Sequence, residues 1–160
     1  FLFSFYTRGM SFIDMAYLKK SDLKNGVIIY RRRKTGQQLT IKWEKCMEDI
    51  IAKYDGYSTS QYLLPIITNP CADERTQYRN AISRINVAMK EVARLAGLNM
   101  PLTMHCARHC WASIAKSKNI PLSVISEGMG HDSEETTRIY LASLDTNVVD
   151  KANSLILKDL

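Results

Sequence analysis

Residues 105–140 of this 160-residue chain read HCARHCWASIAKSKNIPLSVISEGMGHDSEETTRIY and combine helical patterning with the candidate functional side chains. The apolar residues of this stretch recur at helical spacing, interrupted by turn-forming residues. The stretch predicts three helices, with bounds near 103–118, 121–127 and 134–141. His105 and Arg108 are three residues apart, so both side chains lie on one face of the first helix.

Upstream of this stretch, the sequence predicts more helices and a single β-hairpin. Residues 1–18 contain few helix breakers and are predicted to form one helix. VIIYRRR (27–33) and QLTIKW (38–43) are β-rich runs joined by a Lys-Thr-Gly turn, a pattern typical of an antiparallel hairpin. Further helices are expected near 47–54, 73–96 and 148–157. The predicted fold is mainly α with a small antiparallel β-hairpin or sheet (α+β), in one domain.

Charge is distributed unevenly along the chain. The formal net charge is +6, and residues 1–45 contain ten Lys or Arg side chains against three acidic ones. A basic region of this kind favours a polyanionic partner, because contacts to phosphates release bound counterions. Hydrophobic residues at 46% are ordinary for a globular protein, and no apolar run is long enough to cross a membrane. These features favour a protein with a polyanionic partner over a membrane protein.

A zinc site is the main metal alternative. His105 with His109, and Cys106 with Cys110, are pairs at helical spacing that could ligate zinc. Arg108 between them would repel the cation, and no second Cys or His pair follows at zinc-finger spacing. The chain also lacks a glycine-rich phosphate loop and a carboxylate cluster for two-metal catalysis. We therefore expect neither a metal nor a cofactor.

Three short motifs resemble those of the tyrosine recombinases, or phage-type integrases. They are His-x-x-Arg at 105–108, Gly-His at 130–131 and TTRIY at 136–140, in the order that this family has them. The resemblance covers nearly the whole chain and implies the fold of the family's catalytic domain. It also implies site-specific DNA recombination, by strand cleavage and rejoining through a 3′-phosphotyrosyl intermediate. Such a reaction needs neither ATP nor a metal.

The resemblance assigns a role to each matching residue. Tyr140 would be the nucleophile, and Arg108 and His131 would bind the phosphate and stabilise the transition state. His105 would accept or relay the proton of the tyrosine. Lys34, in the hairpin turn, would donate a proton to the departing 5′-hydroxyl. The neighbouring basic side chains are candidates for contacts to DNA phosphates: Arg31, Arg32 and Arg33. Because alternate side chains of a strand face opposite ways, at most part of this run meets the DNA.

One position departs from the family pattern. The family has an arginine where the string GMSFID places Ser11. Arg8 would share a helix face with position 11 in the predicted helix, so we expect Arg8 to supply the missing guanidinium. Asp14 would orient it. Departures of this kind resemble integrases of Bacteroidetes mobile elements.

The resemblance also sets expectations about the whole protein. Residues 1–160 would be a C-terminal catalytic domain whose N-terminal DNA-binding domain lies outside this chain. The working form would be a homotetramer on double-stranded DNA, in a bacterial cytoplasm. The tail at 147–160 is predicted to be an amphipathic helix that packs either on its own domain or on a neighbouring protomer. Two other functions stay open: DNA relaxation of the type IB topoisomerase kind, and a catalytically silent DNA-binding module.

Overall fold

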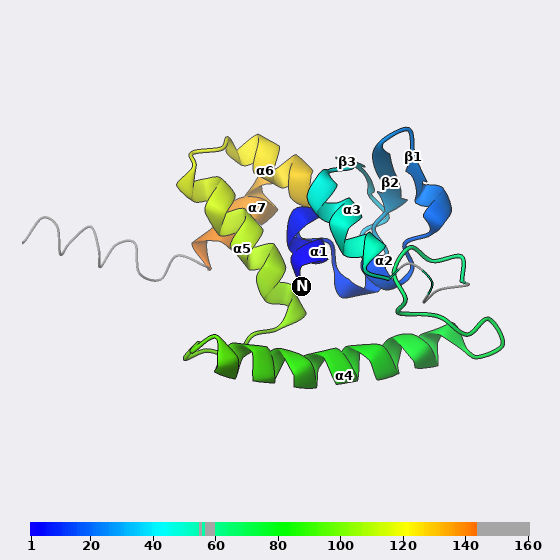
Figure 1. Cartoon of the computed structure of the whole chain (residues 1–160). Helices are drawn as coiled ribbons and strands as arrows, with labels where there is room; N and C mark the ends of the chain where they lie inside the picture. Colours follow the sequence, from blue (N-terminus) through cyan, green and yellow to red (C-terminus); the bar gives the residue numbers. More distant parts are fainter. Residues whose placement is uncertain (55, 57–59, 144–160) are drawn as a thin grey trace, which may run out of the picture.

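The computed structural model describes residues 1–54, 56 and 60–143 and is mainly helical, with a three-stranded antiparallel sheet (Figure 1). The predicted fold class is confirmed. The predicted helix at 148–157 and the tail at 147–160 lie outside the described residues. The elements are α1 (Leu2–Tyr6), α2 (Phe12–Ala16), a 3-10 turn η1 (Lys20–Asp22), β1 (Leu23–Lys24), β2 (Val27–Arg31), β3 (Gln38–Lys42), α3 (Lys45–Ala52), α4 (Glu74–Leu95), α5 (Met104–Ser117), α6 (Leu122–Met129) and α7 (Glu134–Ala142).

The predicted single helix over residues 1–18 is wrong, because the chain turns sharply between α1 and α2. Arg8 and Gly9 both have left-handed backbone angles, with φ of 59° and 77°. A Cβ atom on Gly9 would lie only 2.6 Å from the Cα of Arg108, so a glycine here lets α5 approach the turn closely. Arg8 and Ser11 therefore do not lie on one face of a continuous helix.

The predicted hairpin is confirmed as β2 and β3, and β1 adds a short third strand on the far side of β2. Alternate residues of the hairpin are buried, because successive side chains point to opposite faces of a sheet. The connecting turn is closed at its base, where the Arg32 backbone N–H donates to the Gln37 carbonyl at 2.9 Å. This arrangement leaves Lys34 exposed near the tip of the turn.

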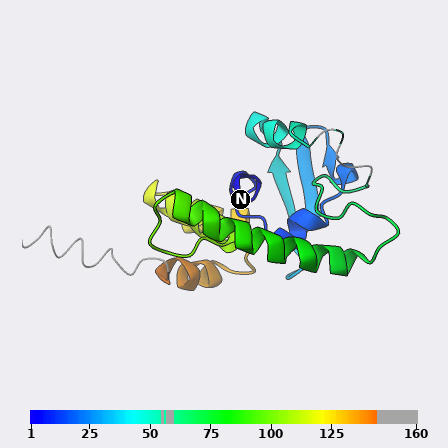
Figure 2. The same cartoon turned by 60° about the horizontal axis from the view of Figure 1, so that its bottom comes forward.

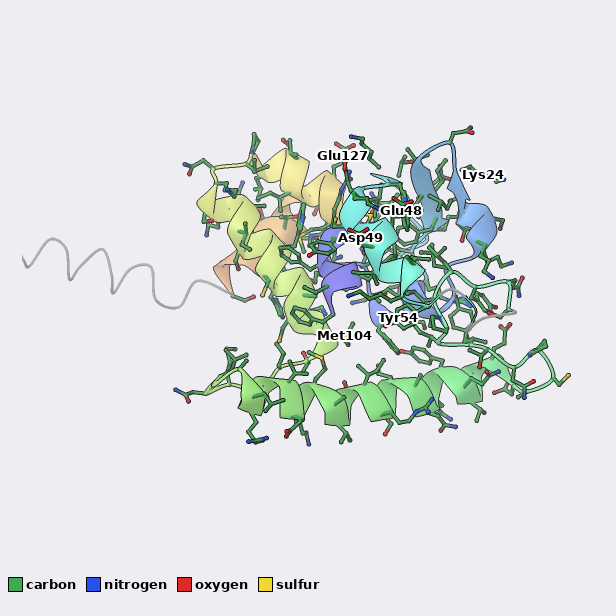
Figure 3. All side chains as sticks on the ribbon, in the orientation of Figure 1. Lys24, Glu48, Asp49, Tyr54, Met104 and Glu127 are labelled. Atoms are coloured by element: carbon green, nitrogen blue, oxygen red, sulfur yellow. The ribbon has the colours of Figure 1, made fainter. Side chains whose placement is uncertain are left out.

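The helices surround α1 in two groups. Helices α5, α6 and α7 lie together on one side of α1, while the sheet and α3 lie on the other, and α4 runs along both groups (Figures 1 and 2). Met104, at the start of α5, extends toward α4 and joins the larger hydrophobic core (Figure 3). A smaller core between α5, α6 and α7 contains Ala112, Ile125 and Leu141. Within the described part of the chain, no helix is both long enough and apolar enough to cross a membrane.

Candidate active site

The residues of the three motifs come together where the ends of α5, α6 and α7 meet the hairpin turn. Arg108 projects from α5, His131 follows the end of α6, and Tyr140 lies on α7. The His131 and Tyr140 rings meet edge to face, with centroids 5.6 Å apart. Lys34 is close enough for its charge to contribute to lowering the pKa of His131.

Arg108 is buried and is held by backbone carbonyl groups. Its Nη1 donates to the Gly9 carbonyl at 3.1 Å, and its Nη2 donates to the Met129 carbonyl at 2.6 Å. Burial, followed by the nearby charge of Arg32, lowers the pKa of Arg108 to about 10, so the guanidinium stays charged at neutral pH. No carboxylate of the described residues lies within ion-pair distance of it. A buried cation without a counter-anion is a natural binding site for an anion.

His131 is fixed in one orientation by two polar neighbours. Its Nδ1 lies 2.8 Å from the Thr137 hydroxyl, and its Nε2 lies 3.1 Å from Nη2 of Arg108. A guanidinium can only donate, so Nε2 accepts from Arg108 and the ring proton sits on Nδ1, facing Thr137. Burial and the charges of Arg108 and Arg32 lower the pKa of His131 to about 4. The imidazole is therefore neutral at pH 7.

Tyr140 is paired with a histidine that the sequence motifs do not single out for this role. The Tyr140 hydroxyl lies 2.7 Å from Nδ1 of His109, and the two rings stack with centroids 5.2 Å apart. Burial raises the pKa of Tyr140 to about 12. Burial and Arg108 lower the pKa of His109, so its imidazole is neutral at pH 7 and can accept a proton.

Among the described residues, no hydrogen bond joins His105 to Tyr140. Its exposed ring meets the His109 ring edge to face, with centroids 4.5 Å apart. His109, and not His105, is therefore the histidine in direct contact with the Tyr140 hydroxyl, and the role of His105 in accepting or relaying the proton stays a prediction. His109 could have been found from the sequence by its spacing of four residues from His105, which places both imidazoles on one face of α5.

The three arginines of the hairpin do not form one uniform basic surface. Arg31 and Arg33 are exposed, and the Arg33 guanidinium lies 3.7 Å from the centre of the Tyr17 ring. Arg32 points the other way and is only 8% exposed, and its Nη1 donates to the Gly130 carbonyl. This agrees with strand alternation, by which at most part of the run meets the DNA on one surface.

Ser11, where the sequence departs from the family pattern, and its neighbours form hydrogen bonds within the protein. Ser11 caps the N-terminus of α2 and donates from its hydroxyl to the Asp14 carboxylate at 2.6 Å. Asp14 also accepts from the Arg33 backbone N–H at 2.8 Å, so it ties α2 to the hairpin turn and does not orient Arg8. The Arg8 Nη1 donates to the Thr40 carbonyl on β3 at 3.4 Å.

The histidine and cysteine pairs of α5 do not gather into a ligand set. Among the residues that the structure describes, no three His, Cys, Asp or Glu side chains converge as a metal site would require. The four cysteines, Cys46, Cys71, Cys106 and Cys110, are free thiols.

Comparison with known proteins gives one family and several structures of similar fold. The model of the phage integrase family matches residues 4–147. A probable integrase/recombinase protein of Methanocaldococcus jannaschii is 26% identical over 130 residues, which cover 78% of this chain and 38% of that protein. This chain thus spans well under half of the curated relative.

Solved structures share the fold at low sequence identity. The XerA recombinase superposes with a TM-score of 0.62 at 21% identity, over 86% of this chain and 48% of that one. The XerH site-specific recombinase gives a TM-score of 0.66 at 20% identity, over 94% of this chain and 43% of that one. That structure is a post-cleavage complex with the palindromic difH substrate. A lambda integrase dimer bound to a core site gives 0.58 at 16% identity, over 87% and 49%.

Proposed function

Because this chain belongs to the phage integrase family, we propose that it cleaves and rejoins DNA strands in site-specific recombination. The observation that carries the proposal is the convergence of Arg108, His131 and Tyr140, with the Tyr140 hydroxyl 2.7 Å from His109. A nucleophile, a proton acceptor and a buried guanidinium without a counter-anion are what an attack on a phosphodiester requires. Recombinases of similar fold that are bound to DNA support DNA as the partner.

The proposed reaction begins when the Tyr140 oxygen attacks the scissile phosphorus and its proton passes to Nδ1 of His109. Arg108 binds the non-bridging oxygens, whose negative charge grows in the transition state. His131 adds a hydrogen bond once the phosphate favours its protonated form. The bond to the 5′-oxygen breaks, and Lys34 gives that oxygen a proton. The products are a 3′-phosphotyrosyl linkage and a free 5′-hydroxyl.

Rejoining runs through the same groups in reverse. A 5′-hydroxyl attacks the phosphotyrosyl phosphorus and releases Tyr140, which regains its proton from His109. One phosphodiester is exchanged for another, so no ATP is needed. The cationic side chains of the protein neutralise the phosphate, so we propose that no metal is needed either. We expect cleavage to continue in EDTA.

The proposal extends to the protein from which this chain comes. We propose that residues 1–160 are the C-terminal catalytic domain of a recombinase that carries a DNA-binding domain before it. The chain's 38% share of the curated relative supports this arrangement. We also propose that it works as a homotetramer on double-stranded DNA in a bacterial cytoplasm. The serine at position 11 supports an origin in a mobile element of Bacteroidetes.

The test is capture of the covalent intermediate. Full-length protein is mixed with duplex DNA from the flanks of its gene, nicked lightly with DNase I so that short 5′-hydroxyl fragments can diffuse away after cleavage. SDS-resistant complexes are expected, with the adduct found on Tyr140 by mass spectrometry and absent in Tyr140→Phe. An adduct on another tyrosine would overturn the assignment. Recombined products support a recombinase, whereas relaxation of supercoiled circles alone supports the topoisomerase alternative.

A further inference from the structure

We propose that Arg32, at the end of the second strand, is the second guanidinium that binds the scissile phosphate. Arg32 would thereby replace the arginine that the family has at the position of Ser11. The inference rests on the proposed function and names a phosphate contact from a different element of the fold. It assigns the role to Arg32 in place of Arg8.

The first support is that Arg32 and Arg108 share one anchoring point. The carbonyl groups at the end of a helix have no partner within the helix and need outside donors. At the end of α6, Met129 and Gly130 provide two consecutive carbonyls of this kind. Arg108 donates to the first and Arg32 donates to the second. The two guanidiniums are therefore neighbours, although one comes from α5 and the other from the hairpin.

The second support is the charge of the cluster. Arg32 and Arg108 are both more than nine-tenths buried, and Arg32 contributes to lowering the pKa of Arg108 and of His131. Among the described residues, no carboxylate forms an ion pair with either guanidinium. Asp14 acts on Arg108 more weakly than Arg32 does and forms no ion pair with it. Two adjacent buried cations without an ion-paired carboxylate disfavour each other, and an anion bound between them removes the conflict. A phosphodiester carries one negative charge, and its pentacovalent transition state carries two.

The third support is the space that the backbone leaves for Arg32. Gly130 ends α6 in the left-handed region, with φ of 62°. A Cβ atom at this position would lie 2.9 Å from Cδ of Arg32. A glycine here therefore lets the Arg32 side chain lie directly against the backbone that leads into His131. The backbone turn at Gly130 thus makes room for the Arg32 guanidinium itself to lie beside the site.

Arg8 has a different environment. It is half-buried, its Nη1 reaches the Thr40 carbonyl on β3, and no hydrogen bond of the described residues joins it to Arg108 or His131. Arg8 thus serves as the matched control for Arg32, because both are arginines that donate to a backbone carbonyl.

The test measures cleavage and DNA binding separately with the full-length protein and the nicked duplex that traps its covalent complex. We expect Arg32→Ala to slow single-turnover cleavage about 100-fold or more, the loss typical of a preorganised transition-state donor. Its affinity for the duplex should change by less than about threefold. Arg8→Ala should cleave within about fivefold of the wild type. Arg32→Lys should recover little, because an ammonium cannot form the forked contact.

A second substrate separates phosphate binding from a purely structural role. Replacing one non-bridging oxygen of the scissile phosphate with methyl removes its charge. If Arg32 neutralises that charge, the defect of Arg32→Ala should shrink from about 100-fold to less than about tenfold on the methylphosphonate. An equal defect on both substrates would mean that Arg32 only supports the fold, and would overturn the inference. Arg32→Gln, which keeps a donor for Gly130, replaces Arg32→Ala if the latter does not fold.

The outcomes also distinguish this inference from the proposed function. A wild-type protein that forms no covalent complex through Tyr140 contradicts the proposed function itself. A wild type that cleaves while Arg32→Ala cleaves equally well contradicts only the role of Arg32. A large loss in Arg8→Ala together with an active Arg32→Ala would assign the second guanidinium to Arg8.

Discussion

The Tyr140 hydroxyl lies 2.7 Å from Nδ1 of His109, and the two rings stack with an angle of 13° between their planes. Tyr140 packs against the smaller core, so α7 holds the phenol against α5. His109 is also the residue next to Arg108. One turn of α5 thus carries both the guanidinium that we propose binds the phosphate and the proposed acceptor of the tyrosine proton.

This contact predicts that His109 contributes more to cleavage than His105. His109→Ala should lower the single-turnover cleavage rate about 100-fold or more, because Tyr140, with a pKa of about 12, then lacks a positioned base. His105→Ala should have a smaller effect, since His105 is exposed and touches only the edge of the His109 ring. The measurement is covalent-complex formation at pH 7 on the nicked duplex. A larger loss in His105→Ala would contradict the assignment.

The spacing of the motifs was enough to predict which helices carry Arg108 and Tyr140, and that His131 lies between two helices. It was not enough to predict the partner of Tyr140, because that contact depends on how α7 packs against α5. Strand alternation indicated that Arg31 and Arg33 face away from Arg32. It did not indicate which side is the interior, because that depends on the position of α6.

The break between α1 and α2 could not be predicted from local sequence either. A single glycine is tolerated within a helix, and the neighbouring Arg8 is normally a good helix former. The left-handed turn exists because α5 approaches so closely that a side chain at Gly9 would collide with Arg108. Tertiary packing thus overrides the local preference, and the expected relation of Arg8 to Ser11 failed for the same reason.

That close approach predicts a large cost for Gly9→Ala. The new methyl would combine an unfavourable φ with a collision against the α5 backbone, so we expect a loss of about 2–4 kcal/mol in unfolding free energy. Gly26→Ala is the matched control, because Gly26 has φ of 73° but a Cβ atom there would meet no atom within 4 Å beyond its chain neighbours. It should cost only about 1–2 kcal/mol. Urea denaturation measures both, and equal losses would show that backbone strain alone matters.

Stability should depend on pH through His131. Its pKa in the folded protein is about 4, below the value of about 6.5 for an unfolded chain, so the unfolded state binds more protons between these values. The free energy of unfolding should therefore rise as pH increases from about 4 to 6.5. His131→Gln should flatten part of this rise in thermal unfolding measured across that range. His105 and His109, whose pKa values are also lowered, should contribute to the remaining slope.

The hydroxyl of Thr137 should matter for cleavage through the orientation of His131. Thr137 is fully buried, and its oxygen accepts the Nδ1 proton of His131, which keeps Nε2 directed at the phosphate site. Thr137→Val preserves the shape but removes that acceptor, so cleavage should fall about tenfold or more. Thr137→Ser keeps the oxygen and should retain most of the activity. Equal rates for the two variants would show that His131 needs no such support.

Lys34 should act on the leaving group and not on DNA affinity. It is exposed at the turn, and its charge contributes to lowering the pKa of both His105 and His131, which places the ammonium beside the cluster. Among the described residues it has no hydrogen bond or ion pair, so its amine is available to the substrate. Lys34→Ala should slow cleavage at least 100-fold while duplex affinity stays within about threefold.

A substrate with sulfur in place of the 5′-bridging oxygen tests that role directly. A thiolate is a far better leaving group than an alkoxide and needs no proton donor. Lys34→Ala should therefore cleave the sulfur-containing duplex at nearly the wild-type rate. Arg31→Ala is the control, since a lost phosphate contact should weaken binding and lower the salt dependence by about one counterion, whatever the leaving atom. If sulfur does not restore cleavage to Lys34→Ala, the ammonium assists at another atom, such as a non-bridging phosphate oxygen.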